Sequence, residues 1–358
     1  MRPAFLVTSG GLDFTGAYSD HLIALSVSDS AGEESDSLTI ELEDALGTIL
    51  VPEEGATVAV SIGYLTNLRD MGLFTVERVT LKGPPDSITI EAKAAPFDSA
   101  GGLVPLQSRK SRSFDATTLG TIIETLANEH GLQAAIDPTL AAVPVPHIDQ
   151  TNESDMNLLT RIARDAGAVM KPMFGRMVFA RRGAGRSISG LALPGALIVA
   201  GEHTAYSVTL AKRESYTGVK ARWHDNETGE TGETETGETV SIPGFGDNIP
   251  LVNIGGSSGF GGVKTYEHPH AFASEEEATR ASGAYLDTFA RRARSASFTM
   301  PGRTDLAAEM LVEAVGFRER VNGQWLIKRA EHKIDRGGYA TSVECEAPGM
   351  AAGGEPSA

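Results

Sequence analysis

The sequence predicts a mainly β fold that carries an inserted α+β domain. A β-strand pattern occurs twice, at residues 69–91 and 320–346, which indicates one β-module used twice in the chain. Apolar and polar residues alternate elsewhere in the first 105 residues, which predicts further short strands joined by turns. Two helix patterns, at residues 115–131 and 154–167, lie between the two copies and predict the α+β part.

The repeated pattern places the same residue types at the same spacing in both copies. The first copy has Arg69, Gly72, Phe74, Val76 and Arg78, and the second has Arg320, Gly323, Trp325, Ile327 and Arg329. A strand that ends in glycine and an aromatic residue precedes each copy, at Gly63-Tyr64 and Gly316-Phe317. A chance likeness between two three-stranded meanders is the alternative interpretation.

Residues 1–105 form the first predicted module. Segments 38–43 and 58–64 each alternate strictly, so each presents one apolar face and one polar face. Turn residues at 67–72 and 83–86 reverse the chain between such segments. Several short strands at this spacing favour a small antiparallel barrel or sandwich.

Residues 106–200 form the predicted α+β insert. Its first helix begins at Asp115 or Thr117 and ends at His130-Gly131, where glycine supplies a left-handed residue. Its second helix begins at Ser154, an N-cap residue type, and ends at Gly167. A hairpin over residues 169–180 follows, with its turn at 174–176.

The second predicted module is split, with strands in residues 201–225 and 295–346. Residues 226–294 are inserted in it and contain a Glu-Thr-Gly-rich stretch, predicted to be a mobile loop or a hydrated hairpin tip. They also contain a helix from Ser274, whose Ser-Glu-Glu-Glu start is a capping box. The tail, residues 347–358, is rich in Gly, Ala, Pro and Ser and is predicted to be disordered.

Composition limits the class of protein. The chain has 358 residues, 41% of them hydrophobic, and a formal net charge of −16, which disfavours wrapping nucleic acid but not passing it through a repelling lumen. The apolar runs at 1–8 and 191–200 are too short for a signal peptide or a membrane span, so we expect synthesis in a cytoplasm and no stable membrane insertion. One cysteine, Cys345, excludes an internal disulfide and is expected in the core.

Several residues have types used in chemistry, and each has a simpler structural interpretation. The Gly-rich run 255–262 lacks a following Gly-Lys-Ser/Thr, and Ser9-Gly10-Gly11 lacks a nucleophile-elbow context. His268 and His270 are predicted to lie in a loop, and Glu153 and Asp155 to favour a helix start. The remaining candidates are His130 at a helix end, Glu331-His332 in a strand, and Arg291, Arg292 and Arg294 at a solvated helix end. We therefore predict no catalytic, cofactor-binding or metal-binding residues.

The order of these parts resembles the late control protein D family, the baseplate hub proteins of contractile-tailed phages. The resemblance covers nearly the whole chain. The residues that carry it are Met71 to Val76 with Gly83-Pro84-Pro85, Gln150 to Ala163 with Gly167-Ala168, Ala273 to Ala278, and Gly323 to His332. The Glu153-Ser154-Asp155 helix start is the most specific of these elements.

The resemblance implies two tube-like β-barrel modules in each subunit of a homotrimeric ring. Such a ring is a symmetry adapter that joins a hexameric tail tube protein to a trimeric central spike protein, among other baseplate proteins. It also implies a central channel through which genome DNA passes without specific binding, and a place in the virion tail baseplate. Phage, prophage and tailocin origins all fit the resemblance, and it supplies no catalytic residues.

Three other interpretations stay open at this stage. The first is the hub portion of a type VI secretion spike, which is similar in fold. The second is a cell-wall-degrading tail enzyme, which requires a paired acid and base in a cleft. The third is a carbohydrate-binding β-protein, which requires exposed aromatic residues on one face, whereas only 6% of the residues are aromatic.

Overall fold

The structure is a computed structural model that describes most of the chain. The described residues are 2–32, 35–94, 106, 108–173, 176–183, 195–210, 216, 218–225, 228–237, 239–242, 246–250, 265–292 and 294–348. The predicted Gly-rich segment 255–262 and all but two residues of the predicted tail lie outside this set. Ala347, one of those two, is buried, and its amide donates to the Arg294 carbonyl.

Module 1 is an antiparallel sheet with one short helix. Its elements are β1 (Pro3–Ser9), β2 (Leu12–Asp13), α1 (Thr15–Ser19), β3 (Leu22–Ser30), β4 (Ser37–Glu43), β5 (Thr57–Tyr64), β6 (Asn67–Lys82) and β7 (Ser87–Ala94). The strand order is β3-β4-β7-β6-β5-β1. The apolar face predicted for β4 and β5 is buried in the module core, for example at Ile40 and Val60.

Module 2 repeats this arrangement with strands from two parts of the chain. Its strands are β13 (Ala196–Val199), β14 (Ala205–Leu210), β20 (Arg294–Pro301), β21 (Leu311–Val315), β22 (Gly323–Asp335) and β23 (Gly338–Glu346). Trp325, Phe298 and Cys345 lie in its core. The expected core position of Cys345 is therefore confirmed, and burial raises the pKa of its thiol to about 12.

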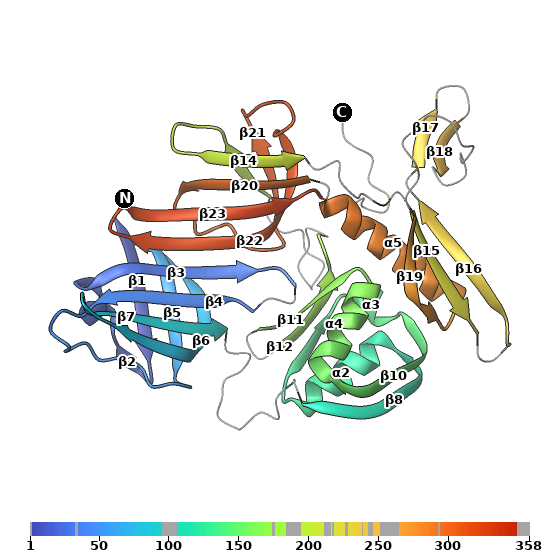
Figure 1. Cartoon of the computed structure of the whole chain (residues 1–358), viewed down its shortest axis with the longest axis horizontal. Coiled ribbons are helices and arrows are strands. Elements are labelled where there is room, and N and C mark those ends of the chain that lie inside the picture. Colours follow the sequence, from blue (N-terminus) through green and yellow to red (C-terminus); the bar gives the residue numbers. More distant parts are fainter. Residues whose placement is uncertain are drawn as a thin grey trace.

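The insert domain is the compact α+β unit at the lower right of Figure 1. It consists of β8 (Arg109–Thr118), α2 (Leu119–Glu129), β9 (Gln133–Ile136), α3 (Pro138–Ala141), β10 (Pro144–Ser154), α4 (Asp155–Asp165), β11 (Ala168–Met173) and β12 (Arg176–Arg181). The first helix starts later than predicted because Thr118 is its cap, whose hydroxyl accepts from the Thr121 amide. The second helix has the predicted cap, Ser154.

A fourth unit packs the longest helix against a small sheet. Its elements are β15 (Gly218–His224), β16 (Thr231–Gly237), β19 (Thr265–Phe272) and α5 (Glu275–Arg292), with a two-stranded ribbon, β17 (Thr239–Ile242) and β18 (Gly246–Pro250), nearby in Figure 1. The prediction that residues 218–224 lie in the second module was wrong, because β15 pairs with β16 and β19. The hairpin alternative for the Glu-Thr-Gly-rich stretch was correct over residues 231–237.

The two modules are joined edge to edge in one sheet, in which no closed barrel occurs among the described strands. The sheet has 13 strands, and its order runs from β14 through β22 and β3 to β2. Figure 1 shows β22 and β3 side by side at the junction. The prediction of two separate barrels missed this junction, because β22 is long enough to pair with β21 at its start and with β3 at its end.

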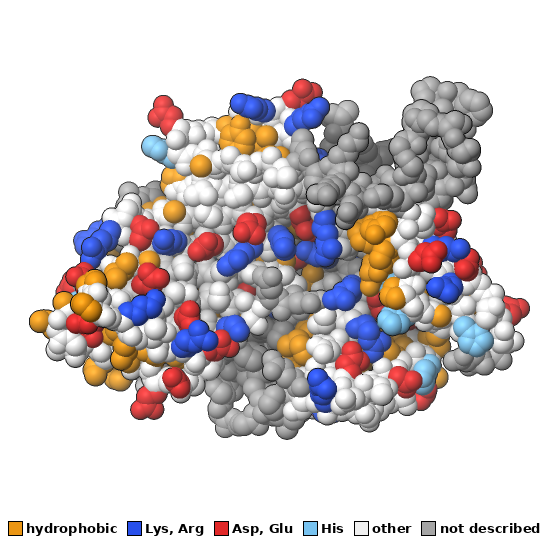
Figure 2. All heavy atoms as spheres, viewed as in Figure 1, with side chains coloured by type: hydrophobic (Ala, Val, Ile, Leu, Met, Phe, Trp, Pro, Cys, Tyr) orange, Lys and Arg blue, Asp and Glu red, His pale blue; other side chains and the backbone are white. Residues whose placement is uncertain are grey.

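The molecule shows a mixed charged surface on the face of this joined sheet. Figure 2 shows acidic and basic side chains interspersed over it, so the net charge of −16 is not gathered into one block there. Within the described part of the chain, no helix is both long and apolar enough to cross a bilayer.

Candidate assembly interface

The repeated sequence pattern corresponds to one repeated strand geometry. In module 1 a β-bulge interrupts the β6–β7 pairing between Val76 and Arg78, and in module 2 one interrupts the β22–β23 pairing between Ile327 and Arg329. A bulge inserts one residue on one strand and is a specific local device, so its recurrence at the same place aligns the two modules residue by residue. The predicted duplication is thus present at the level of register.

The strand orders of the modules also correspond. Module 1 runs β3-β4-β7-β6-β5-β1 and module 2 runs β14-β20-β23-β22-β21-β13. Each of these six strands of module 1 therefore has a counterpart in module 2, with β3 equivalent to β14 and β6 equivalent to β22. The last pair departs from full equivalence, because β13 lies parallel to β21 whereas β1 lies antiparallel to β5.

The junction inside the chain uses the second half of β22. Residues 329–335 pair antiparallel with 24–30 of β3, so that Glu331 lies opposite Ser28 and His332 opposite Val27. Side chains of both strands are buried at this contact: His332 is fully buried and Val27 is 1% exposed. We call this β22–β3 contact the internal junction.

Side chains and a loop reinforce the internal junction. Arg329 Nε donates to Ser28 Oγ at 2.6 Å. The loop between β20 and β21 reaches module 1, where the Ala308 amide donates to Asp29 Oδ2 at 2.9 Å and Gly302 O accepts from the Tyr64 hydroxyl at 2.9 Å. Tyr339 and Ile334 of module 2 belong to the module 1 core. The two modules therefore fold against one another.

The equivalent edges on the outer sides of the sheet have no such cover among the described residues. The second half of β6, residues 78–82, pairs with β7 on one side, and β14 pairs with β20 on one side. Leu81, which occupies the place of His332, is 72% exposed, and Tyr206 of β14 is 40% exposed. Open strand edges with apolar side chains are templates for pairing with another chain. We call these two stretches the open edges.

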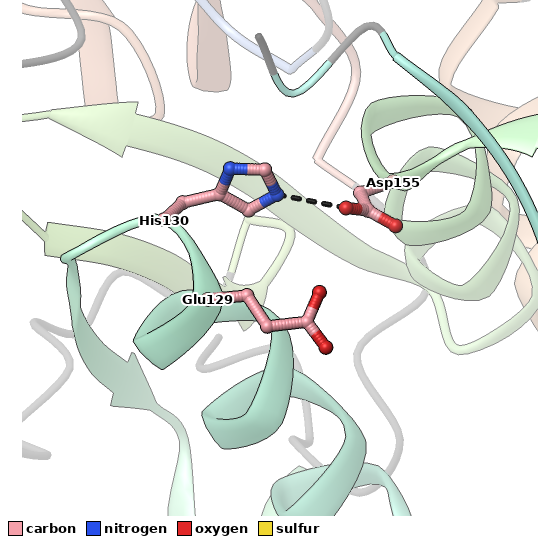
Figure 3. Close-up of side chains that lie close together, drawn as sticks. All are labelled: Glu129, His130 and Asp155. Atoms are coloured by element: carbon pink, nitrogen blue, oxygen red, sulfur yellow. Dashed lines mark hydrogen bonds and ion pairs between the residues drawn. The ribbon is translucent and has the colours of Figure 1, made fainter. Parts of the chain in front are cut away.

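A second cluster lies in the insert domain and has metal-ligand residue types. Glu129, His130 and Asp155 place ligand-type atoms within 4.8 Å of one another, and Figure 3 shows His130 and Glu129 at the end of α2 facing Asp155 at the start of α4. Lys110 Nζ lies 2.7 Å from Asp155 Oδ2 and 2.9 Å from Glu129 Oε2, and Arg112 pairs with the same two carboxylates. Lys110 and Arg112 thus neutralise the two carboxylates in the place of a metal ion.

Asp155 is the centre of this ionic cluster. Its side chain is 1% exposed, and it also accepts from Gln150 Nε2 at 2.8 Å and lies 2.7 Å from His130 Nε2. Burial acts to raise the pKa of Asp155, but hydrogen bonds from Lys110, Gln150 and His130 and the Arg112 charge outweigh it and lower the pKa to about 2. Capping explains Ser154, whereas the buried carboxylate of Asp155 joins β8, β10, α2 and α4.

A cleft between the insert domain and β19 contains carboxylates that could be considered as an acid and base. It has a volume of about 780 Å³ and is lined by Asp165, Glu277, Tyr285 and His268, among others. Burial raises the pKa of Asp165 to about 6, against the charge of Arg161 and with that of Glu277. Glu277 is engaged in the predicted capping box, where it accepts from the Ala273 amide while its own amide donates to Ser274 Oγ. The Glu277 carboxylate therefore has a structural role as part of the helix cap.

The raised pKa of Asp165 predicts a specific pH dependence of stability. A carboxyl with a higher pKa in the folded state holds its proton there between pH 4 and 6, so the free energy of unfolding falls by about 2 kcal/mol as pH rises through that window. Asp165→Asn is expected to remove this decrease and to stabilise the protein at pH 7. Urea unfolding at pH 4, 5, 6 and 7 measures it, and an unchanged slope in the variant would contradict the assignment.

The remaining candidate residues do not gather into one site. His268 and His270 lie on β19, not in the predicted loop, and the His268 ring contacts the aromatic rings of Phe272 and Tyr285. Of the predicted solvated helix end, Arg292 and Arg294 are exposed as expected. Arg291 is instead 3% exposed, because α5 packs there against β20 of module 2. The sequence analysis did not predict a role for Leu81 and Val208 of the open edges. The repeat contained a signal for Leu81, because it aligns this residue with His332, which is buried.

Comparison with known proteins identifies the family of this chain. Residues 75–338 match the family described as the phage tail baseplate hub (GPD). The chain belongs to this baseplate hub family. The match spans the insert domain, the fourth unit, most of module 2 and the last part of module 1. The resemblance found in the sequence is therefore confirmed.

Individual relatives cover nearly the whole chain. The chain is 31% identical to a baseplate hub protein of Escherichia phage 186 and 30% identical to one of Escherichia phage P2, in each case over 97% of this chain and 93% of the relative. It is also similar in fold to the 43 kDa tail protein of prophage MuSo2 from Shewanella oneidensis, with a TM-score of 0.68, 16% identity, and coverage of 97% of this chain and 98% of that one.

Proposed function

We propose that this baseplate hub protein acts as a homotrimeric symmetry adapter that joins a hexameric tail tube to a trimeric central spike. The observation that carries the proposal is the internal duplication. Two modules with corresponding strand order and register lie edge to edge in each chain. Three chains then present six similar modules to a six-fold partner, while the insert domains and the fourth units keep three-fold symmetry.

The proposed partners are proteins that contact the two faces of the ring and its outer side. The ring of modules meets the tail tube protein on one face and the central spike protein on the other, with further baseplate proteins around it. Genome DNA passes through the central channel without specific binding, and a net charge of −16 fits a wall that repels phosphates. The hub is made in the bacterial host cytoplasm and resides in the virion tail baseplate.

The phage reading is favoured over a type VI secretion spike and over an enzyme. Both relatives at 30–31% identity are baseplate hub proteins of phages and are covered over 93% of their length. The ionic cluster and the capping box account for the acidic residues that most resemble a site. The hub is thus proposed to act without catalysis, cofactor or metal.

Measuring the mass of the purified protein by light scattering, alone and co-expressed with the spike protein, tests this function. The expected result is three times the 37.7 kDa chain mass, either alone or only with the spike, and six similar lobes by electron microscopy. A chain that remains monomeric with the spike present, and that cleaves cell-wall material, would return the problem to the tail-enzyme interpretation.

A further inference from the structure

The two open edges complement one another in the same way as the strands of the internal junction. We propose that the second half of β6 pairs with β14 of the next copy, in the register that β22 and β3 adopt within one chain. This inference rests on the proposed ring and specifies how its copies join. A chain that uses one edge pair internally is left with the other pair, namely β14 at one end of the sheet and the second half of β6, which extends beyond the β5–β6 pairing.

The register follows from the two alignments already established. The shared bulge makes Arg78 equivalent to Arg329, so Leu81 is equivalent to His332. On the other side, Leu25 lies opposite Ile40 and Tyr206 opposite Phe298, and Ile40 and Phe298 occupy equivalent places in β4 and β20. Tyr206 is therefore equivalent to Leu25, and Val208 to Val27.

Transferring the internal junction to the open edges gives definite residue pairs. His332 lies opposite Val27, so Leu81 is assigned to lie opposite Val208 of the next copy. Glu331 lies opposite Ser28, so Thr80 is assigned opposite Thr209, and Lys82 opposite Ser207 follows from Lys333 opposite Ser26. We call this predicted contact the copy junction.

Side-chain chemistry is preserved in this transfer. Arg329 donates to the Ser28 hydroxyl at the internal junction. The equivalent pair is Arg78 and Thr209, again a guanidinium and a hydroxyl. Arg78 can turn toward a new partner, since its side chain is 72% exposed and its ion pair with Glu91, the one it makes among the described residues, is 3.3 Å long and also exposed.

Exposed apolar residues also gather where the copy junction places them. In module 2 the loop between β20 and β21 packs on module 1 through Gly302 and Ala308. The equivalent loop of module 1, between β4 and β5, carries Leu46 at 80% and Leu50 at 76% exposure. At the copy junction this loop faces β14 of the next copy, where Tyr206 stacks edge-on against Phe317. These two exposed leucines thus acquire a partner.

The two open edges differ from one another, so the contact is heterologous. Contacts of this kind generate either closed rings or open filaments, depending on whether the rotation closes. A closed ring leaves every β6 edge and every β14 edge paired, which removes the exposed edges altogether. The number of chains in the covalent product of a cross-linking experiment therefore reports closure.

Paired cysteines test the register in the full-length protein. Facing residues on antiparallel strands have Cα atoms about 4.5–5.5 Å apart, within the range of about 4.4–6.8 Å that a disulfide spans. The variant L81C/V208C is expected to form interchain disulfides on mild oxidation, with three chains as the largest product on non-reducing gels. The native Cys345 is 3% exposed and stays out of the reaction.

The matched control is L81C/Y206C, which places the second cysteine two residues out of register on the same face. Diagonal neighbours are about 7–8 Å apart, so this pair is expected to cross-link at least tenfold more slowly. Faster reaction of the control than of L81C/V208C would overturn the register. A trimer by light scattering in which neither pair cross-links would overturn the copy junction but leave the hub function standing. A protein that stays monomeric with and without the spike would overturn both.

Discussion

Replacing Asp155 with alanine is expected to destabilise the insert domain by about 3–5 kcal/mol, because the buried His130 and Gln150 and two partly buried cations lose their carboxylate partner. Lys110 and Arg112 come from β8, Gln150 comes from β10, and all three reach the same side chain. Removing one partner of a buried network costs more than the pair contributes, since the groups that remain are still held away from water. Amide hydrogen exchange in α2 and α4 of the full-length protein measures the loss.

Asp149→Ala is the matched control, since its carboxylate is 61% exposed and, within the described part of the chain, pairs with the half-exposed ring of His147 alone. Its effect is expected to stay within about 0.5 kcal/mol, as for surface ion pairs in general. Equal protection of α2 and α4 in the two variants would show that Asp155 is not the centre of the insert domain. The same result would leave the aspartate of the Glu-Ser-Asp helix start, the most specific sequence element of the family resemblance, without a structural reason.

Local patterns in the sequence predicted the local structure well. The duplicated module is present down to the bulges at Glu77 and Lys328, because a bulge and its flanking residues are encoded within a few positions of one strand. Ser154 and Ser274 cap the helices assigned to them, since a cap needs only a hydroxyl and an amide three residues on. Such features depend on neighbours in the chain and can be predicted from them.

Strand partners could not be predicted, because alternation specifies which face of a strand is buried and not which strand lies beside it. The pattern of residues 218–224 is the same whether β15 joins module 2 or pairs with β16, as it does. The 45-residue separation of Lys110 and Asp155 likewise hid the ionic cluster, and the acidic helix start suggested capping alone. The internal junction was missed for the same reason, since it joins strands about 300 residues apart.

The duplication explains why one chain has both an internal junction and a pair of equivalent open edges. If both edge pairs were joined within the chain, no strand edge would remain for pairing with another copy. If neither were satisfied, the modules would be free to pair in any order. One internal junction fixes the angle between neighbouring modules, so each new copy is added with a geometry that the chain already contains.

Replacing Leu81 with aspartate is therefore expected to abolish ring formation while leaving the chain folded. Leu81 is 72% exposed in the single chain, so the charge costs little there. At the copy junction it would lie opposite Val208 on the face where His332 is fully buried in the internal junction. An unpaired charge at such a place costs at least about 3 kcal/mol, or more than 100-fold in affinity for each of the contacts in the ring. Light scattering of the variant, with and without the spike protein, measures the loss.

Leu65→Asp separates this effect from a general response to added charge. Leu65 is 64% exposed and lies in the turn between β5 and β6, beside the internal junction rather than on an open edge. It is expected to leave the trimer intact, so the two leucines differ by position and not by chemistry. Trimers formed equally well by both variants would rule out the second half of β6 as the assembling edge. Loss of the trimer in Leu81→Asp alone would identify that strand edge as the place where the ring closes.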